Sequence, residues 1–249
     1  MISAVVLTKN NQNSIARCIK SINWADEILV IDDFSTDSTI DIAQKYGAKI
    51  LQHHLDNNFA QSRNSALDKA KGDWVMFIDS DEEIGKDLQV EIQKAVLDGT
   101  FDGYFLKRKD FFFGKWLNYG ETGNVRLLRL GRKNKGKWLR KVHEKWEIKG
   151  PTSQLKNPLS HYPHPTIAHF LKNINDYSTL HAQVAFEEGK KTNYLDILLM
   201  PTGKFLKNYI ILLGFLDGVP GLIMALMMSF HSFLSQAKLW QRQQKKINL

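Results

Sequence analysis

The chain has 249 residues, of which 43% are hydrophobic and 24% are charged. This length and composition suffice for one large hydrophobic core with about fifty residues to spare, and they exclude a disordered or fibrous protein. The net charge of +8 suits a nucleic acid, an anionic membrane or a phosphate-bearing substrate, so charge alone does not separate these partners.

Two features bear on the cellular compartment. Cys18 is the only cysteine, so no intramolecular disulfide can form, and we expect a reducing compartment in which Cys18 is a small buried hydrophobe. The N-terminal apolar run is shorter than a secretory hydrophobic segment, and no basic region precedes it. The sequence therefore predicts a protein that is not exported.

The first hundred residues alternate short β-rich runs with helical patterns, which is typical of βαβ units around a mostly parallel sheet. The expected strands are residues 5–7, 28–31, 50–51 and 74–78. The expected helices lie between them, with apolar faces formed by Ile15, Ile19 and Ile22, by Ile40, Ala43 and Tyr46, and by Ala60 to Ala70 after an Asn58 cap.

Polar and acidic residues follow three of these strands, at 8–11, 32–37 and 79–83. In such sheets, ligands bind beyond the carboxyl ends of the strands. Asp79 and Asp81 can direct two carboxylates at one hard cation, and Mg²⁺ or Mn²⁺ would neutralise a diphosphate leaving group. Acidic residues after a strand can instead cap a turn, but the apolar strand before them and the nearby Asp32-Asp33 pair favour a metal site.

From Asp102 to Ile148 the segments become longer and more aromatic, which predicts an antiparallel addition to the sheet. Basic residues are concentrated between Arg126 and Lys149, as on a solvated strand face or a nucleic-acid patch. Because the acidic edge would repel a polyanion, we expect a phosphorylated saccharide or an anionic membrane there and no nucleic acid. The stretch 161–165 then leads into a helix of roughly twenty residues.

The segment from Tyr209 to Leu234 is nearly all apolar, and glycine and proline at 214–221 divide it into two short halves. Each half is below the ~20 residues of a spanning helix, although Gly218 to Ala237 approaches that length. Basic residues flank both ends, as on the cytoplasmic side of membranes: Lys204, Lys207, Lys238, Arg242, Lys245 and Lys246. The pattern predicts an interfacial helical hairpin, with packing on the preceding domain or on a second copy as the alternative.

Four blocks, at residues 5–10, 30–39, 60–64 and 77–82, resemble in order and spacing the signature of glycosyltransferase family 2. The resemblance implies the GT-A fold, a Rossmann-like and mostly parallel α/β sheet with flanking helices, and inversion at the anomeric carbon. It places Thr8 and Asn10 in the nucleotide pocket, makes Asp33 the acceptor for the base and Arg63 a nucleotide contact. Asn10 stands where the family frequently has an aromatic residue that stacks on the base.

The same resemblance makes Asp81 the principal metal ligand, with Asp79 on the ribose, on a metal-bound water or on the metal. An inverting transfer also needs a general base within reach of the acceptor hydroxyl. The segment 142–146 resembles the His-Glu block of a branch of the family, which makes Glu144 the expected base and has His143 orient the loop or approach the metal. The alternative for Glu144 is a surface carboxylate paired with Lys141 or Lys145, and the other acids in this half are Asp110, Glu121 and Glu147.

Three further histidines, His161, His164 and His169, lack the spacing of a structural zinc site. We expect them to pack or to cap, with His161 as the one outside candidate for completing the divalent site.

The run from Asn208 to Leu222 resembles the tail of the lipopolysaccharide core β-1,4-glucosyltransferase branch, whose members act on lipid-anchored acceptors. We therefore expect a GT-A domain at 1–190 and an amphipathic membrane-docking region at 191–249, on the cytoplasmic face of the inner membrane. The expected reaction is metal-dependent transfer of a hexose, glucose from UDP-glucose, to lipopolysaccharide core or a similar lipid-linked saccharide. The alternatives are a polyprenyl-phosphate sugar synthase and a non-catalytic basic protein that binds nucleic acid or anionic membrane.

Overall fold

The computed structural model describes residues 1–54, 59–140 and 144–247. The chain divides into two compact units, and each unit is built from two separate segments. The first unit comprises Met1–Arg108 and Val125–His161, and the second comprises Lys109–Asn124 and Tyr162–Leu249. Strand β6 (Gly103–Phe112) carries the chain from the first unit into the second.

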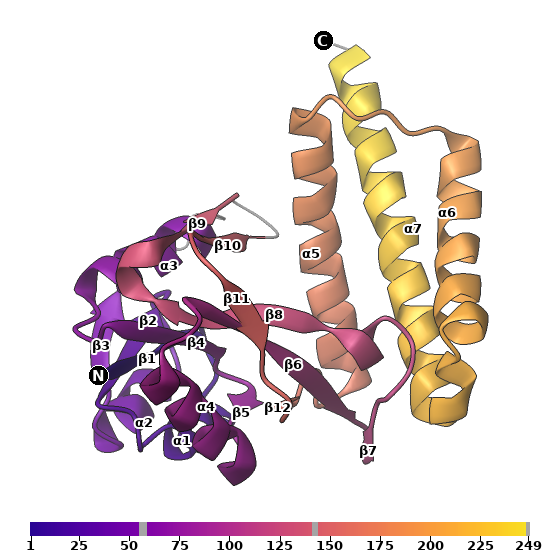
Figure 1. The fold of residues 1–249 in the computed structure, drawn as a ribbon. Coiled ribbons are helices and arrows are strands. Elements are labelled where there is room, and N and C mark those ends of the chain that lie inside the picture. Colours follow the sequence, from indigo (N-terminus) through magenta and orange to yellow (C-terminus); the bar gives the residue numbers. More distant parts are fainter. Residues whose placement is uncertain (55–58, 141–143, 248–249) are drawn as a thin grey trace. The chain divides into compact units, whose positions relative to one another are not determined.

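A parallel sheet begins the first unit (Figure 1). It consists of β1 (Ile2–Thr8), β2 (Glu27–Asp32), β3 (Lys49–Gln52) and β4 (Trp74–Asp79), in the order β3-β2-β1-β4. All neighbouring pairs in this part are parallel, so the four predicted strands and their direction are confirmed.

Both faces of this sheet are covered. Ala4 and Val6 of β1 pack in one apolar cluster with α1 (Ile15–Ser21), α2 (Thr39–Lys45) and α4 (Lys86–Asp98). Val5 and Leu7 point the other way, into a cluster with α3 (Phe59–Lys69). Helix α4 was not predicted, and the Asn58 cap expected for α3 lies outside the described residues.

Antiparallel strands extend the sheet, as predicted. Next to β4 come β8 (Arg126–Arg132), β6, β12 (Leu159–His161) and β5 (Glu82–Glu83). Strand β11 (Thr152–Gln154) differs, because it pairs with β6 in parallel. A separate pair, β9 (Gly136–Leu139) and β10 (Lys145–Ile148), places Trp138 and Trp146 edge-on against Phe77, at 5.0 and 5.1 Å between ring centroids. Short 3₁₀ turns lie at Thr122–Asn124 and Lys133–Lys135.

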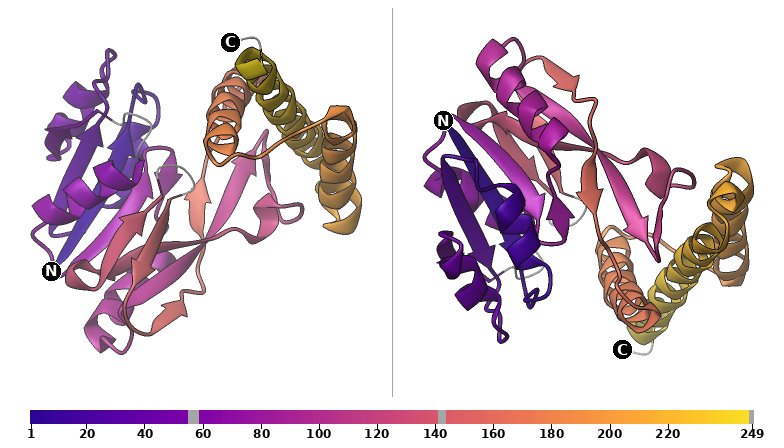
Figure 2. Two further views of the ribbon diagram at one scale, coloured as in Figure 1. Left: turned by 90° about the horizontal axis from the view of Figure 1, so that it is seen from above. Right: turned by 90° about the horizontal axis from the view of Figure 1, so that it is seen from below.

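Three helices dominate the second unit: α5 (Ile167–Glu187), α6 (Tyr194–Leu206) and α7 (Val219–Ile247). Helix α7 lies between the other two, as the views in Figure 2 show. Phe112 of β6 and Leu117, just after β7 (Lys115–Trp116), join Phe170, Ile174 and Met224 in the core of this unit. The 21 residues of α5 agree with the predicted length.

The turn between α6 and α7 falls at the predicted glycines and contains one π turn (Lys207–Ile211) and one 3₁₀ turn (Gly214–Asp217). Asp217 Oδ2 accepts the backbone N–H groups of Asn118 (3.0 Å) and Tyr119 (2.9 Å), and Asn208 Oδ1 accepts that of Glu121 (3.0 Å). Asn208 and Asp217 therefore hold the turn against the 116–124 segment by hydrogen bonds.

The segment 209–234 was expected to form two short halves. The structure differs, because α7 alone runs for 29 residues. Beyond Ser229, α7 continues with polar side chains that contact α5. Lys238 Nζ donates to Asn175 Oδ1 and to Ser178 Oγ, both at 2.8 Å, and the ring of His231 lies edge-on to that of His181.

Part of α7, Val219–Gln244, is long and apolar enough to cross a membrane by length and composition, a property that core helices of soluble proteins share. Helices α6 and α7 form a C-terminal hairpin that leaves large apolar side chains exposed, among them Leu198 and Leu199 on α6 and Leu226 and Phe230 on α7. The predicted boundary after residue 190 lies between α5 and α6.

Candidate active site

The carboxyl ends of β1, β2 and β4 meet at one edge of the first unit. The strand register places Thr8 beside Asp32 and Leu7 beside Asp79. Thr8, Asp33 and Asp79 therefore gather where a parallel sheet binds its ligand. The buried Thr8 hydroxyl has no hydrogen-bond partner among the described residues.

Asn10 is used to close the loop that follows β2. Its side-chain oxygen accepts the backbone N–H of Thr36 at 2.8 Å, and its own N–H donates to Ser35 Oγ at 2.8 Å. Asp32 is buried and accepts the Ser35 N–H at 2.9 Å, so it supports the same loop. Asp33 instead faces the side chains of Lys9, at 2.7 Å, and His54, at 3.7 Å.

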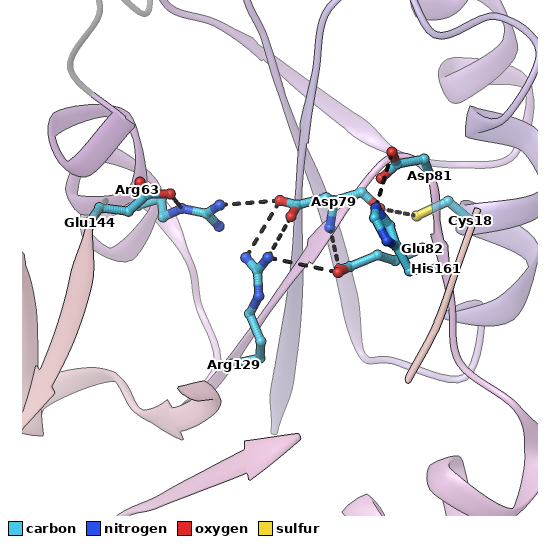
Figure 3. A network of polar contacts seen from close by, with 8 residues as sticks. All are labelled: Cys18, Arg63, Asp79, Asp81, Glu82, Arg129, Glu144 and His161. Carbon is cyan, nitrogen blue, oxygen red and sulfur yellow. Dashed lines mark hydrogen bonds and ion pairs between the residues drawn. The ribbon is translucent and has the colours of Figure 1, made fainter. Parts of the chain in front are cut away.

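Two buried arginines hold Asp79 (Figure 3). Arg63 Nη2 donates to Oδ1 at 3.1 Å, and Arg129 bonds both carboxylate oxygens of Asp79. Burial alone would raise the pKa of Asp79, but the charges of Arg129 and Arg63 outweigh it and hold the pKa well below its ordinary value. Asp79 is therefore an ionised anchor for both guanidinium groups.

Glu82 lies next to Asp79 and Arg129 and is fully buried. Its Oε2 accepts the backbone N–H of Asp79 at 2.9 Å, and its Oε1 lies 3.8 Å from Arg129 Nη2. Burial raises the pKa of Glu82, against the opposing charge of Arg129.

Asp81 and His161 form the part of the site with metal-ligand chemistry. The pairing of β5 with β12 sets His161 opposite Glu82, and His161 Nε2 lies 3.4 Å from Asp81 Oδ2. Two ligand atoms this close can contact one divalent cation. No group of three His, Cys, Asp or Glu side chains suited to a metal occurs in the part of the chain that the structure describes.

Glu144 belongs to the arginine network. Its Oε1 accepts from Arg63 Nε at 3.2 Å, and the Arg63 guanidinium lies over the Trp138 ring at 4.6 Å. Lys141, one of the two lysines of the alternative surface pair, and His143 lie outside the described residues.

The other candidate acids have different surroundings. Glu121 is paired with Lys204 in the second unit, and Glu147 is exposed on β10 opposite Lys137. Asp110 is buried in the second unit.

Two of the remaining histidines have structural contacts. The His164 ring stacks on Phe170 at 3.7 Å, and the His169 backbone N–H donates to Thr166 Oγ1 at the start of α5. Sequence reasoning gave no site role to Arg129 or Glu82, and His161 was only an outside candidate. Arg129 had no distinguishing signal, because it was one of ten basic residues in the segment.

Comparison with known proteins decides the family. The sequence model described as Glycosyl transferase family 2 matches residues 3–177 of this chain. The chain belongs to glycosyltransferase family 2.

Relatives of this family 2 glycosyltransferase cover its whole length. An uncharacterized glycosyltransferase of Rickettsia conorii is 28% identical over 276 residues, which cover 100% of this chain and 93% of the relative. The lipopolysaccharide core biosynthesis glycosyltransferase LpsC of Rhizobium meliloti is 28% identical over 97% of this chain and 92% of its own.

Among solved structures, residues 1–349 of Staphylococcus aureus TarS in complex with UDP-GlcNAc superpose with a TM-score of 0.51. The sequence identity is 18%, and the match covers 98% of this chain and 92% of that one. This likeness confirms the predicted GT-A fold.

Proposed function

We propose that this family 2 glycosyltransferase transfers a hexose to a lipid-linked saccharide of the lipopolysaccharide core type. The hexose is glucose, the donor is UDP-glucose, and the anomeric carbon is inverted. The observation that carries the proposal is the convergence of Arg63, Asp79, Asp81 and Glu144 at the ligand-binding edge of a GT-A sheet. The full-length similarity to LpsC supports the acceptor class.

Asp81 and His161 are the residues that would hold Mg²⁺ or Mn²⁺, because their ligand atoms already converge. Bound there, the cation would supply Lewis-acid stabilisation of the diphosphate leaving group. Asp79 supports this site indirectly, since both of its oxygens are engaged by guanidinium groups that it orients.

Glu144 would remove the acceptor proton as the sugar bond forms. Arg63 positions the Glu144 carboxylate at 3.2 Å while contacting Asp79, so one guanidinium links the proposed base to the donor side of the site. Thr8, Asn10, Asp33 and Arg63 would form the nucleotide pocket.

The C-terminal region would attach the enzyme to the cytoplasmic face of the inner membrane. Its exposed apolar side chains on α6 and α7 support this, since contiguous exposed apolar surface marks protein or membrane contacts. A lipid-linked acceptor is itself confined to that surface.

The test is a screen of nucleotide sugars for thermal stabilisation of the full chain with Mn²⁺ present, followed by transfer from each stabilising donor to a glycolipid acceptor. UDP-glucose should raise the unfolding midpoint, because a ligand that binds only the native state stabilises it by mass action. Stabilisation by no nucleotide sugar, together with salt-steep binding to DNA, would instead favour the non-catalytic alternative.

A further inference from the structure

Phe34 is an exposed aromatic residue beside the proposed base acceptor. It follows Asp33 directly, is 42% exposed and has a backbone φ of +52°. The left-handed region is unfavourable for a bulky side chain, and such conformations gather at functional sites. The loop therefore holds a large apolar ring outward in a conformation that glycine would adopt more easily.

The Phe34 ring is already part of a stack. Its centroid lies 4.0 Å from that of His54, with 22° between the planes. His54 comes from the segment after β3, and its Nδ1 lies 3.7 Å from Asp33 Oδ1. The His54 ring thus adjoins both the Phe34 ring and the Asp33 carboxylate.

At the end of β1, by contrast, there is no ring to stack on a base. The side chain of Asn10 there is an amide, and its oxygen is bonded to Thr36.

We propose that Phe34, supported by His54, is the stacking platform for the base of the nucleotide donor. The assignment rests on the proposed nucleotide-sugar donor. A uracil ring lying on Phe34 would present its imide N–H to Asp33, so stacking and hydrogen bonding would act on one base.

Calorimetric titration of the full chain with UDP and Mn²⁺ tests the platform through Phe34→Gly and Phe34→Tyr. Loss of one base stack should weaken UDP binding by about 5- to 150-fold in Phe34→Gly, whereas Phe34→Tyr should bind as wild type. Pyrophosphate has no base, so its affinity should be the same in all three proteins. The unfolding midpoint of Phe34→Gly should not fall, because glycine accepts a φ of +52° without strain.

Phe113→Gly is the matched control, since Phe113 is also aromatic, 39% exposed and at positive φ (+44°), but belongs to the second unit. Unchanged UDP affinity in Phe34→Gly would overturn the platform, as would an equal loss with pyrophosphate, in Phe34→Tyr or in Phe113→Gly. A change confined to the acceptor KM would instead assign Phe34 to the acceptor sugar. If wild-type protein binds no nucleotide at all, it is the proposed function that fails.

Discussion

Glu144 and Glu147 lie three residues apart, yet only Glu144 contacts the arginine network. We expect Glu144→Gln to lower the transfer rate by about 10²- to 10⁴-fold, because the amide cannot accept the acceptor proton. Donor affinity should persist, since glutamine keeps an oxygen for Arg63. Single-turnover transfer and calorimetric titration on one preparation separate the two effects.

Glu147→Gln is the control and should retain wild-type turnover. Transfer that survives Glu144→Gln would remove Glu144 from the chemistry and favour a polyprenyl-phosphate sugar synthase, whose phosphate acceptor needs no base.

Asp79 and Asp81 were both predicted metal ligands. Asp79 is paired with arginine, whereas Asp81 lies beside His161. Asp81→Asn should abolish the Mn²⁺ dependence of UDP binding and nearly all transfer, because the leaving group loses its stabilising charge. A Mn²⁺ titration of UDP affinity measures this, with the exposed Asp41→Asn on α2 as the control. Full activity of Asp81→Asn in metal-stripped buffer would contradict the assignment.

Some residues of the site could be predicted from the sequence, and others could not. Asp33, Asp79 and Asp81 were identified because they lie at or just beyond the end of a strand, and strand ends can be located from local patterns. Arg129 lies within β8, and only the antiparallel pairing of β8 with β4 shows which basic side chain turns inward to Asp79. Their catalytic and binding roles stay predictions.

At the scale of elements, Glu27 joins three strands of the parallel sheet. It starts β2 and accepts from Ser3 Oγ of β1 (2.7 Å), Lys49 Nζ of β3 (3.1 Å) and the Lys71 backbone N–H (2.8 Å). Burial would raise its pKa, but these hydrogen bonds and the charge of Lys49 lower it below the ordinary value of 4.5.

A carboxyl whose folded-state pKa is lowered stabilises the fold above its unfolded pKa, and loses this contribution as the pH falls through the folded value. Glu27→Gln should therefore reduce the free energy of unfolding by about 1–3 kcal/mol at pH 7, and by progressively less below pH 4.5. Urea denaturation at several pH values measures the difference. An equal loss at every pH would show that packing, and not ionisation, matters at Glu27.

The elements differ in how well local patterns describe them. The strands and α1 were predicted because their apolar periodicity matches their burial. Helix α4 was missed because it buries only Leu88 and Ile92, while Val90 and Leu97 are exposed and blur the pattern. The length of α7 depends on polar contacts with α5, which no local window contains.

At the scale of the whole molecule, exposed large apolar side chains are concentrated in the C-terminal hairpin. Leu199→Glu and Phe230→Glu should each reduce binding to phosphatidylglycerol vesicles by about tenfold, because a charge replaces a side chain that enters the lipid. Co-sedimentation with vesicles is the measurement.

Leu97→Glu is the matched control, because Leu97 is 85% exposed but lies on α4 of the first unit. Vesicle binding that is insensitive to both hairpin substitutions would argue against membrane docking. Self-association that these substitutions abolish without vesicles would assign the face to a second copy.

The division into units could not be read from the sequence, because it depends on contacts between residues 109–124 and residues beyond 162. Asp217 and Asn208 make such contacts, with Asn118 and Glu121, which lie 99 and 87 residues earlier. The predicted boundary after residue 190 relied on composition, which changes at the apolar tail.

This interleaving limits how the protein can evolve or be re-engineered. The helical unit keeps Phe112 and Leu117 in its core, and these residues lie at the end of β6 and between β6 and β8 of the catalytic sheet. Deleting the tail would leave this inserted segment without its partners, and grafting the tail onto another enzyme would not transfer them. Catalytic and C-terminal parts of such a chain must therefore be inherited together, and exchanging the C-terminal unit between relatives requires recombination at two places.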